Sequence, residues 1–177
     1  MREKIVILIG YMGAGKTTLG RALAKKLGRT FNDLDWLIEE RTGKTIPQIF
    51  TEQGEDGFRK IERQVLLDAV ENEGTVLAVG GGTPCFFDNI DIMNRKAQTI
   101  YLQASPSTLM AHIKMGGTDR PLLKGKNDEQ LLDYIKSSLQ AREPFYSRAS
   151  HKVTIETIAT AEQIDAYVDL IKNIITK

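Results

Sequence analysis

Residues 10–17 read Gly10-Tyr11-Met12-Gly13-Ala14-Gly15-Lys16-Thr17, which matches the pattern G-x-x-x-x-G-K-[ST] at every position. An apolar run at residues 5–9 comes before this motif and predicts a buried strand. Residues 18–28 follow it and predict a helix that ends at Gly28. A strand, a glycine-rich loop and a helix in this order form the context in which the motif binds phosphate. The alternative is a simple glycine turn between a strand and a helix, and the complete motif in this context argues against it.

The loop at residues 10–17, called the phosphate loop below, predicts a nucleotide site. Its glycines let the backbone curl so that successive N–H groups point inward, and the helix N-terminus adds positive potential. We expect Lys16 to reach the β- and γ-phosphates and the Thr17 hydroxyl to bind Mg²⁺. The expected nucleotide-binding residues are Gly13, Ala14, Gly15, Lys16, Thr17 and Thr18.

The composition is that of an ordinary soluble protein. The chain has 177 residues, of which 41% are hydrophobic and 27% charged, and we expect a single domain over residues 1–177. A net charge of +1 points neither to nucleic acid nor to a membrane surface. The single cysteine, Cys85, excludes an internal disulfide and suits a reducing compartment. The first apolar run is too short for a signal peptide or a membrane span, so we expect a cytoplasmic protein.

Predicted strands and helices alternate along the chain. The predicted strands are residues 5–9, 30–35, 75–79, 98–102 and 151–155. The predicted helices are residues 18–28, 36–41, 46–53, 58–72, 87–94, 106–115, 128–142 and 161–177, with Pro144 expected to stop the seventh. This alternation indicates an α/β fold with a mainly parallel sheet and helices on both faces. Ligand sites in such folds lie at the carboxyl ends of the strands.

Asp33 and Asp35 stand at the end of the second predicted strand. Residues two apart in a strand point to the same face, so both carboxylates are expected to face one cleft. One of them could hold Mg²⁺ through water, and the other could accept a proton from a substrate hydroxyl. The alternative is that one of the two caps the helix that follows.

Three glycines, Gly80-Gly81-Gly82, follow the third predicted strand. They would allow a ligand to approach the backbone closely, although they could also form a simple tight turn.

Three arginines are candidates for binding an anion. Arg59 is predicted in the first turn of a helix, where a cation opposes the helix dipole, which hints at an anionic partner. Arg142 is predicted near a helix C-terminus, where a cation is locally favourable without any ligand. Arg120 lies in a polar, glycine-containing segment that is the best candidate for a lid, at about residues 114–126. There it could swing onto the nucleotide phosphates or remain a solvated surface charge.

Two other potentially reactive residues are given no role. His112 is predicted as a helix-surface or half-buried residue. Cys85 has no cation or base beside it in sequence and is not expected to be a nucleophile.

The chain resembles the bacterial type of shikimate kinase over nearly its whole length. The matching segments, in the order and spacing of that family, are residues 10–18, 31–35, 54–62, 80–82, 120–123 and 142–146. The phosphate loop alone occurs in very many proteins, whereas the double Asp, the F-R-x-x-E segment at residues 58–62 and the triple glycine are together much more specific.

The resemblance implies a three-layer α/β/α fold with a five-stranded parallel sheet of the nucleoside-monophosphate-kinase type and a small lid. It implies transfer of the ATP γ-phosphate to the 3-hydroxyl of shikimate, with a substrate-binding region at about residues 33–62. The residues that would bind shikimate are Asp35, Arg59, Gly81 and Arg142. Asp33 would help hold Mg²⁺ through water with Thr17 as the direct ligand, Glu62 would orient Arg59, and Arg120 would contact ATP. The catalytic residues would then be Lys16, Asp35 and Arg120, in a protein that we expect to be a monomer.

Two segments depart from the family pattern. The segment before Arg120 is about one residue shorter than expected and has Lys114 where an arginine is common. Residues 156–159, on the expected adenine side, lack a proline that is often found there.

Other kinases and a nucleotide-driven switch are the alternatives. A gluconate kinase or a nucleoside monophosphate kinase would not be expected to carry the double Asp together with Arg59 and the triple glycine. A GTPase switch needs D-x-x-G and N-K-x-D motifs, and neither occurs in the sequence.

The lid candidate generates a testable prediction. We expect Arg120→Ala to lower the turnover number more than it weakens binding of the acceptor. A cation that reaches the phosphates only after closure acts mainly on the transition state. Steady-state kinetics of the variant measures both quantities, and loss of acceptor affinity with an unchanged turnover number would contradict the lid role.

Overall fold

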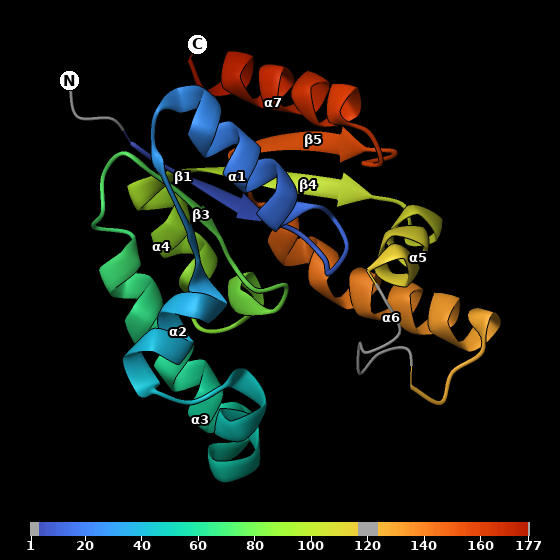
Figure 1. The fold of residues 1–177 in the computed structure, drawn as a ribbon. Helices are drawn as coiled ribbons and strands as arrows, with labels where there is room; N and C mark the ends of the chain where they lie inside the picture. Colours follow the sequence, from blue (N-terminus) through green and yellow to red (C-terminus); the bar gives the residue numbers. More distant parts are fainter. Residues whose placement is uncertain (1–3, 117–123, 177) are drawn as a thin grey trace.

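The computed structural model describes residues 4–116 and 124–176 and places the strands of this part of the chain in one parallel sheet (Figure 1). The strand order across the sheet is β2 (Thr30–Asp33), β3 (Thr75–Ala78), β1 (Ile5–Ile9), β4 (Ala97–Ala104) and β5 (His151–Ile155). All four neighbouring pairs are parallel, so the sheet predicted as mainly parallel is parallel throughout.

The central strand β1 is buried because both of its neighbours and both faces are covered. Each residue of Ile5–Ile9 is at most 2% exposed. Leu8 lies in register with Ala78 of β3 and with Ile100 of β4. The continuous apolar run in the sequence therefore reflects burial on both faces of a parallel sheet.

Helices cover the two faces of this sheet. They are α1 (Lys16–Leu27), α2 (Leu34–Thr42), α3 (Ile46–Ala69), α4 (Asn89–Lys96), α5 (Pro106–Met115), α6 (Asp128–Tyr146) and α7 (Ala161–Ile175), with a short 3₁₀ turn η1 (Thr83–Cys85). α1 and α7 lie side by side over one face, whereas α4 and the end of α6 lie behind the sheet in this view (Figure 1). The predicted three-layer α/β/α fold with five parallel strands is confirmed.

The junction between β2 and α2 differs from the prediction of a strand over residues 30–35. β2 ends at Asp33, and α2 begins at Leu34. The reason is a cap, because the Asp33 carboxylate accepts a hydrogen bond from the backbone N–H of Asp35 at 3.0 Å. Asp35 therefore lies in the first turn of a helix and not in a strand.

The two helices predicted at 46–53 and 58–72 form one element, α3, with a break between them. Gly54 has φ 67° and ψ −175°, a conformation that glycine adopts without strain and that interrupts the helical path. The second part resumes directly after Gly54 rather than at residue 58, since acidic residues such as Glu55 suit a helix N-terminus. It ends at Ala69, a few residues before the predicted end.

Pro144 does not stop α6, which continues to Tyr146. A proline inside a helix leaves the carbonyl four residues earlier without its donor. That carbonyl belongs to Gln140, an exposed residue, so water can satisfy it. Tyr146 is completely buried, and its packing holds the last turn on the core.

A smaller difference concerns the segment after β3. The helix predicted at 87–94 is present as α4, two residues later, after the turn η1. Arg120 and most of the predicted lid at 114–126 lie outside the described residues. In the part of the chain that the structure describes, no helix has both the length and the apolar character needed to cross a membrane.

Candidate active site

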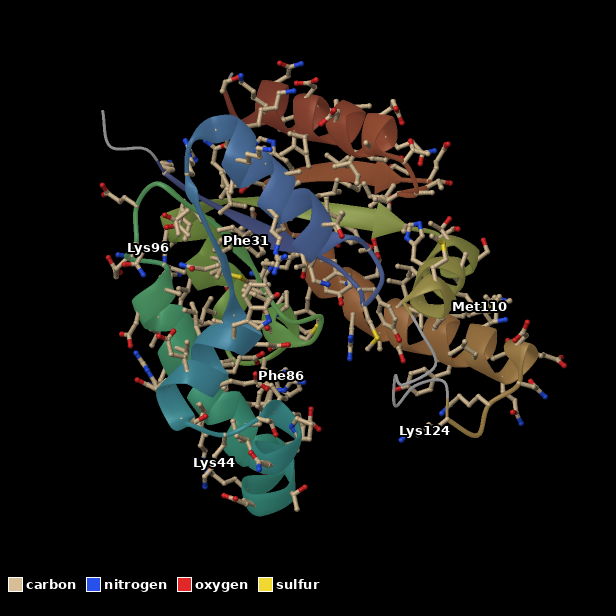
Figure 2. The ribbon with its side chains drawn as sticks, viewed as in Figure 1. Phe31, Lys44, Phe86, Lys96, Met110 and Lys124 are labelled. Carbon is tan, nitrogen blue, oxygen red and sulfur yellow. The ribbon has the colours of Figure 1, made fainter. Side chains whose placement is uncertain are left out.

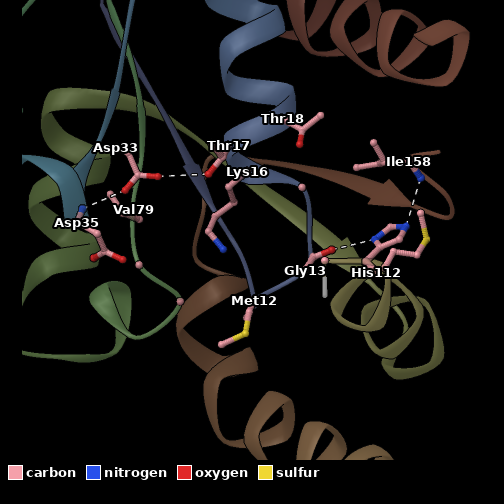
Figure 3. Close-up of a pocket in the computed structure, with 15 residues that line it drawn as sticks. Met12, Gly13, Lys16, Thr17, Thr18, Asp33, Asp35, Val79, His112 and Ile158 are labelled. Carbon is pink, nitrogen blue, oxygen red and sulfur yellow. Dashed lines mark hydrogen bonds between the residues drawn. The ribbon is translucent and has the colours of Figure 1, made fainter. Parts of the chain in front are cut away.

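A pocket of about 530 Å³ opens where the phosphate loop, the β2–α2 junction and the residues after β3 meet, at the carboxyl ends of the central strands (Figure 3). Sequence alone predicted this location from the parallel sheet. The residues that line the pocket are Met12, Gly13, Gly15, Lys16, Thr17, Thr18, Asp33, Asp35, Val79, Gly80, Gly81, His112, Met115, Gly116 and Ile158.

The phosphate loop has the backbone that its glycines were expected to allow. Gly13 and Gly15 have φ of 84° and 90°, which is the left-handed region that costs other residues strain. The loop leads directly into α1, whose first residue is Lys16. The N-terminus of α1 therefore faces the pocket, as anion binding requires.

Lys16 is held at the bottom of this loop. Its ammonium donates hydrogen bonds to the carbonyl oxygens of Gly10 at 2.7 Å and Tyr11 at 2.9 Å. Burial lowers the pKa of Lys16 to about 8, and the nearby Asp33 and Asp35 carboxylates oppose that shift. Lys16 thus remains largely cationic at neutral pH, in a fixed position beside the pocket.

Asp33 connects the phosphate loop with α2. One of its carboxylate oxygens accepts from the Thr17 hydroxyl at 3.2 Å, and the other caps α2 as described above. The alternative that one acid is a helix cap is therefore correct for Asp33. The capping role does not exclude a metal role, because the structure still places Asp33 directly beside Thr17, the other predicted metal-binding residue.

Asp35 reaches the same pocket from the first turn of α2. Burial raises the pKa of Asp35 to about 6, and the neighbouring carboxylates of Asp33 and Glu62 add to the shift, while Lys16 opposes it. The prediction that both carboxylates reach one cleft is thus correct, although the strand geometry used to derive it is not. A carboxylate with a pKa near 6 is ionised at neutral pH and more basic than an ordinary one, which suits proton transfer.

The glycines after β3 leave space for charged side chains from three different elements. A Cβ atom on Gly82 would lie 2.6 Å from Nη2 of Arg59, and one on Gly81 would lie 3.0 Å from Nη1 of Arg142. A Cβ atom on Gly80 would lie 3.6 Å from a carboxylate oxygen of Asp35. The protein's own arginines thus lie close to this glycine run, and a side chain at residue 81 or 82 would crowd them. The predicted close approach of a ligand stays a prediction.

Arg59 is fixed on α3 by opposite charge and by an aromatic ring. Its guanidinium donates to Glu62 at 3.0 Å and to Glu55 at 3.2 Å, and lies 4.0 Å from the ring centroid of Phe86. Phe86 stands beside α3 in Figure 2. Because the helix resumes at residue 55, Arg59 is not in its first turn, so the predicted conflict with the helix dipole does not exist. The side chain is only 11% exposed even so, which indicates a positioned cation rather than a solvated one.

Glu62 is the buried partner that orients Arg59, as the family resemblance implied. It is 1% exposed, and its second carboxylate oxygen accepts from the Thr83 hydroxyl at 2.7 Å. Both oxygens of this buried carboxylate therefore have donors, and these hydrogen bonds offset the cost of removing its charge from water. Sequence reasoning assigned nothing to Thr83, which no motif distinguishes.

Arg142 comes from the last turns of α6 and lies beside Gly81, a residue of the pocket lining. Its guanidinium carbon lies 5.2 Å from the ring centroid of Tyr11 in the phosphate loop. One turn later the buried Tyr146 hydroxyl donates to the carbonyl oxygen of Gly81 at 2.6 Å. Burial raises the pKa of Tyr146, so the hydroxyl stays protonated and keeps this bond over the whole physiological range. Tyr146 is a second positioning group that the sequence analysis missed, since its side chain signals only a core residue.

The structure thus lines one pocket with Lys16, Thr17, Asp33, Asp35 and Gly81. Arg142 and Arg59 do not line it themselves and lie against Gly81 and Gly82 of the adjoining glycine run. In the described part of the chain, no group of three or more His, Cys, Asp or Glu side chains is arranged to hold a metal. Any cation here would instead use hydroxyl and carboxylate oxygens, which Mg²⁺ prefers. Of the other predicted site residues, Gly13, Gly15 and Thr18 also line the pocket, whereas Ala14 is buried and does not line it. Arg120 lies outside the described residues.

Fold and site together define a P-loop kinase with a small-molecule acceptor site. Comparison with known proteins identifies the group within this class. The profile of the family described as "Shikimate kinase" matches residues 12–172. The chain belongs to the shikimate kinase family.

Individual relatives agree with this assignment over almost the whole chain. A shikimate kinase of Phocaeicola vulgatus is 48% identical, over 97% of this chain and 98% of the relative. The crystal structure of the Bacteroides thetaiotaomicron shikimate kinase has a TM-score of 0.94 at 42% identity and covers 98% of this chain and 99% of its own. A shikimate kinase from Acinetobacter baumannii, solved in complex with shikimate, has a TM-score of 0.81 at 37% identity, over 98% of this chain and 94% of its own.

The environment of Asp35 generates a prediction about stability and pH. Its pKa is about 6 in the folded protein, above the ordinary 3.8, so ionisation of this carboxyl opposes folding. The penalty is absent at low pH, grows as pH rises between these two pKa values, and is complete above pH 6. Asp35→Asn removes it, and we therefore expect the variant to have a higher Tm than the wild type at about pH 7.5 and a smaller gain at about pH 4.5.

Thermal unfolding at both pH values measures this difference. Glu40→Gln, which changes an exposed carboxylate on the same helix, is the matched control and should show no gain that depends on pH in this way. A lower Tm of Asp35→Asn at neutral pH would show that the carboxylate is stabilised by its surroundings, contrary to the prediction.

Proposed function

We propose that this protein transfers the γ-phosphate of ATP to the 3-hydroxyl of shikimate, giving shikimate 3-phosphate and ADP, a step of chorismate and aromatic amino-acid biosynthesis. One observation carries the proposal: the glycines after β3 bring Asp35, Arg59 and Arg142 beside the pocket that contains the phosphate loop. A phosphate donor site thus adjoins a site for an acid that bears hydroxyl groups. Membership of the shikimate kinase family supports the same activity independently.

The nucleotide phosphates would lie on the phosphate loop, against backbone N–H groups of Gly13 and residues 15–18 and the N-terminus of α1. Lys16 already donates two hydrogen bonds to loop carbonyls, and an ammonium has three hydrogens. The third is available for a phosphate oxygen, and it carries positive charge to the group being transferred. Positioning and charge neutralisation of this kind account for most of the catalysis in phosphoryl transfer.

Thr17 and Asp33 fit a magnesium site. The Thr17 hydroxyl donates its hydrogen to Asp33, which leaves the lone pairs of its oxygen for a cation. Thr17 would be the direct ligand, and Asp33 would act through a bound water. When bound, Mg²⁺ neutralises charge on the nucleotide phosphates.

Asp35 would accept the proton of the acceptor hydroxyl. The residue lines the pocket on the side of the glycine run, and its raised pKa makes it a stronger base than an exposed aspartate. As an acceptor of hydrogen bonds it also suits a ring that carries adjacent hydroxyl groups.

Arg59 and Arg142 would bind the acceptor carboxylate. Guanidinium groups bind carboxylates through paired hydrogen bonds, whereas an uncharged polyol would need neither cation. Their guanidinium groups lie against neighbouring residues of the glycine run, Gly82 and Gly81, so a single ligand there could contact both. Arg120, from the segment after α5, would add positive charge on the ATP side, and we expect the enzyme to act as a cytoplasmic monomer.

The arginine pair generates the direct test of this function. Removing one partner of a buried charge pair costs roughly 2–5 kcal/mol, so Arg59→Ala and Arg142→Ala should each weaken shikimate use about thirty-fold or more. The KM for ATP should change little. The carboxamide analogue of shikimate should be a very poor substrate, because it lacks the charge that the arginines bind.

A coupled assay of ADP release, with and without shikimate, measures these constants. Arg63→Ala is the matched control, since Arg63 lies one turn further along α3 but pairs with Asp88 and Asn89, away from the pocket. Lys16→Ala should be folded and inactive. Wild-type constants in both arginine variants, or normal turnover of the carboxamide, would rule out the proposed acceptor.

Gly82 provides a more selective prediction. Its φ of −87° and ψ of −18° suit alanine, but the new Cβ would collide with the guanidinium of Arg59. We expect Gly82→Ala to raise the KM for shikimate about ten-fold, the value of a displaced charge-assisted hydrogen bond. The KM for ATP should stay close to wild type, because the displaced guanidinium lies beside the acceptor end of the pocket. Equal changes in both Michaelis constants would contradict this account.

A further inference from the structure

The imidazole of His112 joins three segments that are distant in the sequence (Figure 3). The ring projects from α5, and its Nδ1 lies 2.8 Å from the carbonyl oxygen of Gly13 in the phosphate loop. Its Nε2 lies 3.2 Å from the backbone nitrogen of Ile158, in the segment after β5. His112 and both of its partners line the pocket.

These two partners determine the protonation state of the ring. A backbone N–H can only donate, so Nε2 must accept the hydrogen bond from Ile158 and carries no hydrogen. A carbonyl oxygen can only accept, so Nδ1 must carry the hydrogen and donate it to Gly13. The ring is therefore neutral and in the Nδ1–H tautomer, and both nitrogens are used.

The bond to Gly13 fixes one peptide plane in the middle of the phosphate loop. On one side of this plane the N–H of Ala14 donates to the carbonyl oxygen of Tyr11 at 3.1 Å. On the other side the carbonyl of Gly13 accepts from His112. Gly13 has φ 84°, where a glycine peptide rotates easily, so the two bonds together hold an orientation that the backbone alone does not impose.

The hydrogen bond from Ile158 fixes the segment after β5, which forms another part of the pocket wall. The Ile158 side chain packs against the phosphate loop so closely that a Cβ on Gly15 would lie 2.3 Å from its Cδ1. In Figure 3, His112 and Ile158 stand at one end of the pocket and Asp33 and Asp35 at the other, with Lys16 and Thr17 between them. Since the acceptor groups are at the Asp35 end, the nucleoside of a bound nucleotide extends toward the His112 end.

We propose that His112 is a positioning residue for the nucleotide, in which one neutral imidazole holds both the phosphate loop at Gly13 and the nucleoside-side wall at Ile158. The proposal rests on the proposed function in two respects, that a nucleotide enters the pocket and that its acceptor binds at the Asp35 end. It assigns His112 no contact with the acceptor and no part in proton transfer.

Two substitutions each remove one of the two hydrogen bonds of the imidazole. His112→Asn keeps a donor near the place of Nδ1 and loses the acceptor for Ile158. His112→Gln can place an acceptor near Nε2 and loses the donor to Gly13. The loss of one hydrogen bond corresponds to about a five-fold rise in the KM for ATP in each variant, and His112→Ala, which loses both, should show about a twenty-five-fold rise.

The matched control is His151→Asn, at the first residue of β5 and outside the pocket lining, which should leave both Michaelis constants unchanged. The KM for shikimate should stay at the wild-type value in all His112 variants. A role in stability alone would lower Tm and leave the KM for ATP at the wild-type value in every variant, and that result would overturn the proposal. Equal changes in both Michaelis constants would overturn it as well.

Two further measurements do not depend on the acceptor. Calorimetric titration with Mg·ADP should show the same ranking of the variants, so this test remains valid if shikimate proves not to be the substrate. Long-range ¹H–¹⁵N spectra of the histidine rings at neutral pH should show a hydrogen on Nδ1 and none on Nε2 of His112, a signature that packing alone would not require. A hydrogen on Nε2 would overturn the proposed arrangement.

Discussion

Arg59 and Arg142 lie beside the pocket in space that side chains at Gly82 and Gly81 would occupy. This steric constraint governs the acceptor half of the site. The two cations come from α3 and α6, which are far apart in the sequence, and they converge only because the backbone after β3 has no Cβ atoms in their way. A Cβ atom on Gly80 of the same run would lie 3.6 Å from a carboxylate oxygen of Asp35. The absence of side chains at residues 80–82 thus determines where the two arginines and Asp35 can contact a ligand.

The charges around the pocket balance one another at short range. Lys16, Arg59 and Arg142 stand among Asp33, Asp35 and Glu62, and burial makes each ionised group costly unless it is paired. The lowered pKa of Lys16 and the raised pKa of Asp35 are the two places where pairing is incomplete. A phosphate group supplies what Lys16 lacks, and proton transfer uses the basicity of Asp35. The two incompletely paired groups are therefore the ones that phosphate binding and proton transfer use.

Both glycine loops are held in the same way, by side chains that bind their outward carbonyl groups. Tyr146 of α6 donates to Gly81, and His112 of α5 donates to Gly13. Glycine gives these loops their curvature but no rigidity of its own. Rigidity comes from the side chains of α5 and α6 that bind these carbonyl groups and order the loops before a ligand arrives. This arrangement reduces the entropy cost of binding.

Sequence alone determined the phosphate loop, the parallel α/β fold and the set of acids, arginines and glycines, because those features depend on local pattern and spacing. It misjudged the ends of elements at Asp33, Gly54 and Pro144, where a side-chain cap, a glycine conformation or the burial of Tyr146 outweighs average propensity. The partners of Arg59 and Arg142 at Gly82 and Gly81, and the roles of Thr83, Tyr146 and His112, were decided only by tertiary structure. These residues act through contacts between segments that lie 20 or more residues apart in the chain. Such contacts leave no local pattern in the sequence.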